Sequence, residues 1–169
     1  MSHPALEQQL FSLLSESGIT IATAESCTGG LVAYRITTVA GSSAYFLGSI
    51  VAYSNEMKRT LLGVSSKTLD ERGAVSAECA SEMAVGVQRV TGATIAVSTT
   101  GIAGPGGATA RKPVGLIYLA CAGPEEVSVR EVRWSGDRHQ NMTDAATLAL
   151  EMIIDTGNKL VRPADHPGV

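Results

Sequence analysis

The segment that most constrains the fold is an extended run near the N-terminus that ends abruptly in small polar residues. Residues 20–24 read Thr-Ile-Ala-Thr-Ala, and residues 25–32 continue as Glu-Ser-Cys-Thr-Gly-Gly-Leu-Val. A strand that turns through glycines into a helix brings side chains and backbone N–H groups to one point, where α/β proteins bind anions or build an oxyanion hole. Ser26, Cys27 and Thr28 are candidate nucleophiles there, although the same residues also suit an ordinary turn and helix cap.

Length and composition limit the classes of protein that this chain can represent. The 169 residues suit a single domain, with a core over about residues 5–160 and a loose tail after it. Hydrophobic residues make up 44% and aromatic residues 4%, so the core is expected to consist mainly of Ala, Val, Leu and Ile. No apolar run approaches the roughly 20 residues of a membrane span, and residues 1–7 lack signal-peptide features, so we expect a cytoplasmic protein without membrane contact.

Charge and cysteine spacing exclude further classes. The net charge of −3 argues against direct nucleic-acid binding and leaves room only for a local basic pocket. The cysteines and histidines are scattered and form no metal-binding spacing: Cys27, Cys79, Cys121, His3, His139 and His166. We therefore expect no disulfide framework, no metal and no organic cofactor.

Hydrophobic periodicity predicts alternating helices and strands. Helices are expected at residues 4–17, 29–39, 55–62, 66–72, 77–91 and 139–160, and strands at 19–25, 47–53, 94–100, 115–121 and 127–134. Ser54, Ser65 and Ser76 are candidate N-caps. The apolar segment 47–53 predicts a buried strand, and the short link between the last two strands predicts an antiparallel hairpin. The order predicts an α/β fold, a three-layer α/β/α sandwich around a mixed, mainly parallel sheet.

Three later segments carry candidate chemistry. Residues 101–107 hold four glycines just after an expected strand, and successive N–H groups in such a loop can cradle a phosphate, although a plain surface loop is the alternative. Tyr53 and Lys58 follow another strand, where Lys58 is either part of a cleft or an ordinary solvated lysine. Arg138 near the start of the last helix can help to hold a phosphate.

Taken together, these motifs resemble one known family over nearly the whole chain. The matching stretches are T-A-E-S-C-T-G-G (23–30), A-G-S-S-A-Y-F (40–46), V-A-Y-S-N-E-M-K (51–58), L-G-V (62–64), G-A-V-S (73–76), T-G-I-A-G-P-G-G (100–107), K-P-V-G (112–115) and S-G-D-R (135–138). In this order they resemble the CinA C-terminal domain family, also known as the PncC-type nicotinamide-nucleotide amidohydrolases, in its stand-alone form.

The resemblance implies hydrolysis of the carboxamide of nicotinamide mononucleotide to nicotinate mononucleotide and ammonia. It implies Ser26 as nucleophile and Lys58 as base, with Tyr53 orienting Lys58 or relaying a proton, and an acyl-serine intermediate. The small mononucleotide would be the partner, and a homo-oligomer or a monomer both suit the sequence. The expected substrate-binding residues are Cys27, Thr28, Gly29, Gly30, Ser42, Ser43, Asn55, Thr100, Gly101, Ile102, Ala103, Gly104 and Arg138.

Three alternatives remain open on the sequence. A cysteine amidase would use Cys27, but no histidine is evidently placed to serve that thiol. A non-catalytic nucleotide-binding or competence-related interaction module would keep the phosphate loop and would not need a neutral Lys58. The third alternative is an amidohydrolase that acts on a different small amide.

Overall fold

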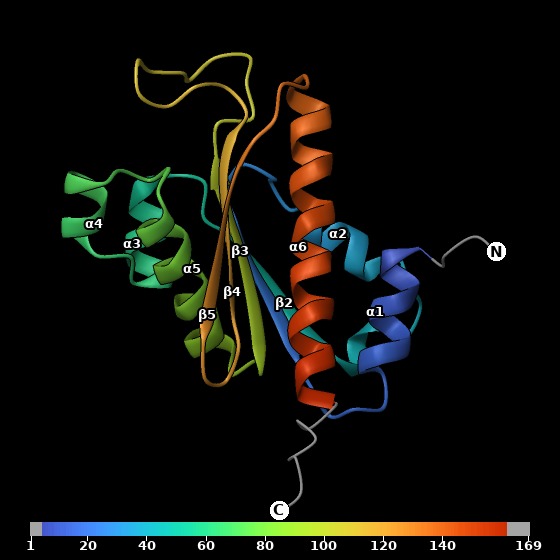
Figure 1. Ribbon diagram of the computed structural model, residues 1–169. Helices are drawn as coiled ribbons and strands as arrows, with labels where there is room; N and C mark the ends of the chain where they lie inside the picture. The colour runs from blue at the N-terminus through green and yellow to red at the C-terminus, as the bar shows by residue number, and fades with distance from the viewer. Residues whose placement is uncertain (1–4, 162–169) are drawn as a thin grey trace, which may run out of the picture.

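The computed structural model describes residues 5–161 and shows a five-stranded sheet between two layers of helices (Figure 1). The strands are β1 (Ile21–Glu25), β2 (Phe46–Val51), β3 (Ile95–Gly101), β4 (Leu116–Ala122) and β5 (Val127–Arg133). The helices are α1 (Leu6–Leu14), α2 (Leu31–Thr37), α3 (Asn55–Leu62), α4 (Ser66–Glu71), α5 (Ala77–Thr91) and α6 (Arg138–Val161), with a 3-10 helix η1 (Ser42–Ala44). The expected loose tail lies outside the described residues, apart from Val161, which ends α6.

The sheet order is β2-β1-β3-β4-β5. Strand β1 pairs in parallel with β2 and β3, whereas β4 is antiparallel to both β3 and β5. Four strands therefore share one direction, and β4 alone among the described strands runs against them. Helices α1, α2 and α6 cover one face and α3, α4 and α5 the other (Figure 1), which confirms the predicted three-layer sandwich.

Local capping explains why three of the helices begin where they do. The hydroxyl oxygens of Ser54, Ser65 and Ser76 accept the N–H groups three residues further on, at 3.2, 3.0 and 3.2 Å. Gly63 and Gly92 end α3 and α5 in the left-handed conformation, with φ of 72° and 71°. The three predicted N-caps are thus confirmed.

The prediction of a buried strand at residues 47–53 was wrong. Strand β2 lies at the edge of the sheet, and Leu47 and Val51 are 49% and 45% exposed. The apolar run reflects an edge strand that is only partly covered by α2 and α5. Sequence periodicity cannot reveal this, because strand order is a tertiary property.

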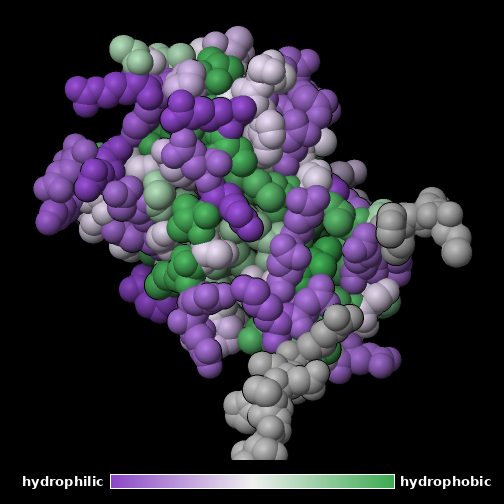
Figure 2. All heavy atoms as spheres, viewed as in Figure 1, coloured by the Kyte–Doolittle hydropathy of each residue, from purple (hydrophilic) through white to green (hydrophobic). Residues whose placement is uncertain are grey.

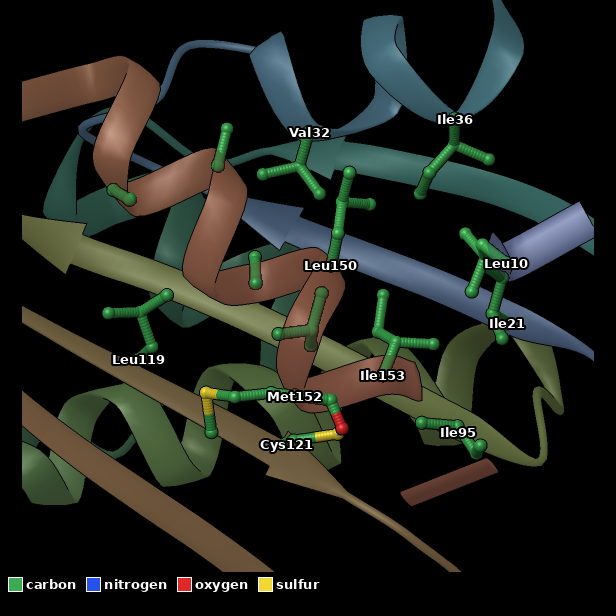
Figure 3. Close-up of a cluster of buried hydrophobic side chains, with 14 of the residues drawn as sticks. Leu10, Ile21, Val32, Ile36, Ile95, Leu119, Cys121, Leu150, Met152 and Ile153 are labelled. Carbon is green, nitrogen blue, oxygen red and sulfur yellow. The ribbon is translucent and has the colours of Figure 1, made fainter. Parts of the chain in front are cut away.

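Two apolar layers hold the helices against the sheet. Figure 3 shows the layer beneath α6, where Leu150 and Ile153 of that helix face Ile21, Ile95 and Leu119 of the strands. On the opposite face, alanines of α5 pack on alanines of β4, so this helix approaches the sheet closely. In Figure 2, hydrophilic side chains cover most of the visible surface, and hydrophobic ones gather mainly between the helix layers.

The fold places the ends of distant segments together. The carboxyl ends of β1 and β3, the long loop after β3 and the start of α6 lie at one end of the sheet (Figure 1). None of the helices within residues 5–161 is long and apolar enough to cross a membrane.

Candidate active site

A serine and a buried lysine meet at the carboxyl end of β1. Ser26 follows the last residue of this strand, and its N–H donates to the carbonyl of Thr99 on β3 at 3.0 Å. Lys58 lies on α3, and its Nζ is 2.9 Å from Ser26 Oγ. The lysine is 1% exposed and the serine 8%. Two groups that are 32 positions apart in sequence thus form one hydrogen-bonded pair.

The surroundings of Lys58 shift its protonation equilibrium towards the neutral amine. Burial lowers the pKa of Lys58, because the ammonium form loses hydration in the interior. No ion pair among residues 5–161 involves this side chain. Its Nζ also donates to the carbonyls of Ala52 and Tyr53, at 2.9 and 3.3 Å. A neutral amine that gives its two hydrogens to these carbonyls points its lone pair at Ser26 Oγ, which is the arrangement a general base requires.

The pair opens into a cavity of about 200 Å³. Nine of the predicted site residues line it: Ser26, Cys27, Tyr53, Asn55, Lys58, Thr100, Gly101, Ala103 and Arg138. A second hollow of about 560 Å³ adjoins the first and shares Ala103 and Arg138 with it. The two hollows thus lie next to each other at this end of the sheet, on either side of shared lining residues.

Tyr53 and Arg138 meet at the rim of the cavity. One nitrogen of the Arg138 guanidinium donates to the Tyr53 hydroxyl at 3.1 Å, and another donates to the carbonyl of Gly104 at 2.8 Å. The Tyr53 side chain is 61% exposed, and its contact with Lys58 runs through the backbone carbonyl instead of the phenol. The Tyr53 phenol has no hydrogen bond with Lys58 among the described residues, so the predicted orientation of Lys58 or proton relay by this side chain stays a prediction.

The turn after Ser26 narrows the choice of oxyanion-hole donors. The N–H of Gly29 donates to the carbonyl of Ser26, and the N–H of Gly30 donates to the Glu25 carboxylate. Among the described residues, no carbonyl, carboxylate or hydroxyl oxygen accepts from the N–H groups of Cys27 and Thr28. These two amides are candidate oxyanion-hole donors, and of the two residues Cys27 lines the cavity.

Cys27 is poorly suited to act as a nucleophile. Burial raises the pKa of its thiol to about 12, and a hydrogen bond with Thr99 offsets only part of this. The thiol is 5% exposed. Because the thiolate is the reactive form, this environment argues against the cysteine-amidase alternative.

The structure does not bring every predicted residue to the cavity. Ser42 and Ser43 belong to η1, which leads into β2 at the opposite end of the sheet from Ser26. The backbone of Ile102 is bonded to Leu116 and Gly115 near β4. These three residues do not line the cavity, and neither do Thr28, Gly29 and Gly30, so the predicted ligand contacts of all six stay predictions.

Sequence reasoning missed four residues of the site region. Ala74 and Val75 line the cavity; the available signal was the family-like stretch G-A-V-S (73–76), to which the sequence analysis assigned no site role. Asn141 is fully buried, and its amide donates to the carbonyls of Ala103 and Gly136, so it ties the glycine loop to the start of α6. The sequence signal for Asn141 was its position as a polar residue within the apolar stripe of α6. Glu25 was also missed, although a lone acidic residue at the end of an apolar strand is unusual.

The described residues contain no cluster of three or more His, Cys, Asp or Glu side chains that could hold a metal ion. The expectation that the protein uses no metal therefore stays a prediction from the sequence.

Fold and site together define a class, the α/β sandwich proteins that hold a serine hydroxyl against a buried lysine at the carboxyl end of a parallel strand. Within it, the chain belongs to the CinA family, because the model of the CinA C-terminal domain matches residues 3–156. It is 49% identical over 142 residues to a CinA-like protein of Geotalea uraniireducens, covering 84% of this chain and 34% of that protein. A CinA-like protein of Geobacter sulfurreducens is 51% identical over 141 residues, covering 83% of this chain and 34% of that protein.

Solved structures support the same assignment. The competence/damage inducible protein CihA from Agrobacterium tumefaciens superposes with a TM-score of 0.86 at 41% identity, covering 92% of this chain and 99% of that one. A CinA superfamily protein from Enterobacter cloacae superposes with a TM-score of 0.86 at 26% identity, covering 93% and 96%. The chain spans about one third of the length of the curated relatives it matches.

Proposed function

We propose that this chain is an amidohydrolase that cleaves the carboxamide of nicotinamide mononucleotide to nicotinate mononucleotide and ammonia. The observation that carries the proposal is the contact of 2.9 Å between Lys58 Nζ and Ser26 Oγ, with the lysine buried and its pKa lowered. A serine hydroxyl becomes a competent nucleophile when an adjacent base takes its proton, and a neutral lysine is such a base.

In the first half of the reaction, Ser26 Oγ attacks the carboxamide carbon while its proton moves to Lys58 Nζ. The oxyanion that forms would accept the N–H groups of Cys27 and Thr28, which have no other oxygen acceptor among the described residues. Lys58 then returns the proton to the departing nitrogen, so that ammonia leaves and an acyl-serine remains.

In the second half, water enters the position that ammonia vacated. Lys58 takes a proton from this water, and the resulting hydroxide attacks the acyl carbon. The bond to Ser26 Oγ breaks, the proton returns to the serine oxygen, and the product acid loses its remaining proton to solvent and leaves as the carboxylate. Each step moves a proton between Lys58 and a group next to Ser26, so that no further acid or base from the protein is required.

The shape and charge of the site support a small anionic substrate. The cavity of about 200 Å³ beside Ser26 suits a single heteroaromatic carboxamide. The adjoining hollow leads past Arg138, whose guanidinium would bind the phosphate of the ribose 5′-phosphate. That side chain now donates to the neutral Tyr53 hydroxyl, a contact that a phosphate can replace with a stronger charge-assisted one.

The test is ammonia release from nicotinamide mononucleotide by wild type and by Ser26→Ala and Lys58→Ala. Ser66→Ala and Lys67→Ala are matched controls, because both residues are exposed on α4 and lie outside the cavity lining. We expect turnover by wild type and both controls, and a loss on the order of 10³-fold or more in the two site variants, each shown to be folded. Activity that survives in Ser26→Ala would contradict the serine mechanism.

The absence of turnover by pure, folded wild type would refute the proposed substrate and turn attention to another amide or to a binding role. Binding of the mononucleotide without ammonia release would favour the nucleotide-binding module.

A further inference from the structure

Glu25 is a buried carboxylate that the proposed reaction does not use. It directly precedes Ser26, and its side chain is 0% exposed. It takes part in none of the ion pairs formed within residues 5–161. A carboxylate without water or a cationic partner is costly unless hydrogen bonds replace its hydration, so its surroundings call for an explanation.

Donors from the following turn and helix surround both carboxylate oxygens. Oε2 accepts the N–H groups of Gly30 and Val32 at 2.9 and 3.1 Å, and Oε1 accepts the N–H of Ala33 at 2.8 Å. The Thr28 hydroxyl donates to Oε2 at 2.7 Å. Glu25 therefore supplies the carboxylate that accepts the free N–H groups at the start of α2.

The same contacts tie the turn to the sheet. The Thr28 hydroxyl is also 2.7 Å from the Thr99 hydroxyl of β3. Since Thr28 gives its hydrogen to Glu25, it accepts from Thr99, and a chain of hydrogen bonds runs from β3 through the turn to the carboxylate. The backbone of Glu25 is itself held in the sheet between β2 and β3. Residues 26–30 are thereby fixed at both ends.

Glu25 does not reach the reacting groups. It is absent from the lining of the cavity, and its carboxylate faces α2, whereas Lys58 lies on α3 on the other side of the sheet. The structural link from Glu25 to the reacting groups is the turn, whose Cys27 and Thr28 amides donate to no oxygen atom among the described residues.

We propose that Glu25 is a positioning residue, which locks the turn at 26–30 so that the N–H groups of Cys27 and Thr28 converge on the oxygen of the acyl group attacked by Ser26. The inference rests on the proposed function, because it assumes attack by Ser26. It assigns a role to a side chain that is not needed as acid, base or ligand.

The substitution Glu25→Gln tests the need for a carboxylate at nearly constant shape. A glutamine amide must point its NH₂ either at the N–H groups of Gly30 and Val32 or at that of Ala33. Donors then face donors, and the turn is expected to shift. The matched control is Glu82→Gln, because Glu82 accepts the Ser65 N–H at 2.7 Å and the Thr68 hydroxyl at 2.5 Å, yet lies outside the cavity lining.

The readout is the rate at which a fluorophosphonate labels Ser26, because this probe does not depend on the identity of the natural amide. The serine oxygen forms a bond to phosphorus, fluoride leaves, and Lys58 takes the hydroxyl proton. The developing negative charge on the phosphoryl oxygen would draw on the same amide donors. Circular dichroism and thermal unfolding check the fold of each variant.

We expect folded Glu25→Gln to label at least about tenfold more slowly than wild type, since losing one oxyanion donor costs on the order of 10²–10³-fold. With nicotinamide mononucleotide, kcat should fall while KM stays near the wild-type value, because Glu25 does not line the cavity. Glu82→Gln should lose stability and label at the wild-type rate. Wild-type labelling by folded Glu25→Gln, or equal slowing in both glutamine variants, would overturn the proposal.

If Glu25→Gln does not fold, Thr28→Val tests the positioning role of Glu25 instead, because it removes the hydroxyl that links the carboxylate to the turn. Labelling should slow in Thr28→Val and recover in Thr28→Ser, and a wild-type rate in folded Thr28→Val would overturn the proposal. Wild type that labels but releases no ammonia refutes the substrate alone and leaves the Glu25 comparison intact. Wild type that does not label overturns both proposals.

Discussion

Lys58 combines full burial with three hydrogen-bond partners and no charged partner among the described residues. At the scale of single residues, this environment has a consequence for stability as well as for catalysis. Burial lowers the pKa of Lys58 from its ordinary value of 10.5. Between the lowered pKa and about 10.5, the unfolded chain binds more protons than the folded protein, so the free energy of unfolding rises with pH across this window.

We therefore expect the difference in unfolding free energy between wild type and Lys58→Met to move in favour of wild type as the pH rises from about 7 towards 10.5. Urea unfolding of both proteins at several pH values measures this difference, and a difference that is independent of pH would contradict the lowered pKa.

The activity of the enzyme should depend on the same group: the wild-type kcat/KM should increase as the pH rises through the lowered pKa of Lys58. Lys58→Arg, which stays protonated, should lose on the order of 10²–10⁴-fold.

The cysteines provide a second prediction at this scale. Burial raises the pKa of Cys27 to about 12 and that of Cys79 and Cys121 to about 11. We expect iodoacetamide at about pH 8 to modify none of the three quickly in the folded protein and all of them after unfolding, because the thiolate is the reacting form. Mass spectrometry of peptides gives the rates, with the unfolded protein as control. Rapid alkylation of Cys27 in the folded protein would revive the cysteine alternative.

At the scale of secondary-structure elements, a close contact between α3 and α5 positions the catalytic lysine. A Cβ atom added to Gly86 in α5 would collide with the carbonyl of Leu62, the last residue of α3. Lys58 lies on the same short helix, one turn before that contact. The glycine thus lets α3 lie close enough for the lysine to reach Ser26.

We expect Gly86→Ala to lower the free energy of unfolding by about 1–3 kcal/mol through overpacking, although alanine favours helix by about 1 kcal/mol. It should also lower kcat, because α3 must move away from α5. Gly106→Ala is the control for stability, since a Cβ atom there would meet nothing within 4 Å. Urea unfolding measures both variants, and a Gly86→Ala protein as stable as wild type would show that the contact relaxes at no cost.

At the scale of the whole molecule, the site draws on distant parts of the chain, so a bound ligand should stabilise the entire fold. Ser26 follows β1, Lys58 lies on α3 and Arg138 begins α6. We expect nicotinamide mononucleotide to raise the melting temperature of Ser26→Ala, which binds without turnover, since a ligand at 100 times its Kd adds about 2.7 kcal/mol. Differential scanning calorimetry measures the change.

The matched comparison is the double variant Ser26→Ala/Arg138→Ala. Its melting temperature should respond much less to the mononucleotide, whereas nicotinamide alone, which has no phosphate, should affect both proteins equally. An equal response of the two proteins to the mononucleotide would contradict the proposed phosphate contact of Arg138.

Local features of the sequence determined much of the fold. The serines before α3, α4 and α5 are N-caps because their hydroxyls reach amides only three residues away. The short link between β4 and β5 permits only an antiparallel pair, and the strand, glycine turn and helix around Ser26 form as the local pattern predicts. Capping, turn chemistry and periodicity act over a few residues, so they can be read without knowledge of the partners.

Only the tertiary structure decided which distant groups meet. The approach of Lys58 to Ser26 depends on where α3 packs, and the edge position of β2 depends on strand order. The Glu25 carboxylate meets the Gly30 N–H only when the turn after β1 has formed, and the Asn141 amide meets the Ala103 carbonyl only when α6 packs against the loop after β3. Such contacts arise when apolar layers fix whole elements against one another, and a linear pattern of residues contains no information on that geometry.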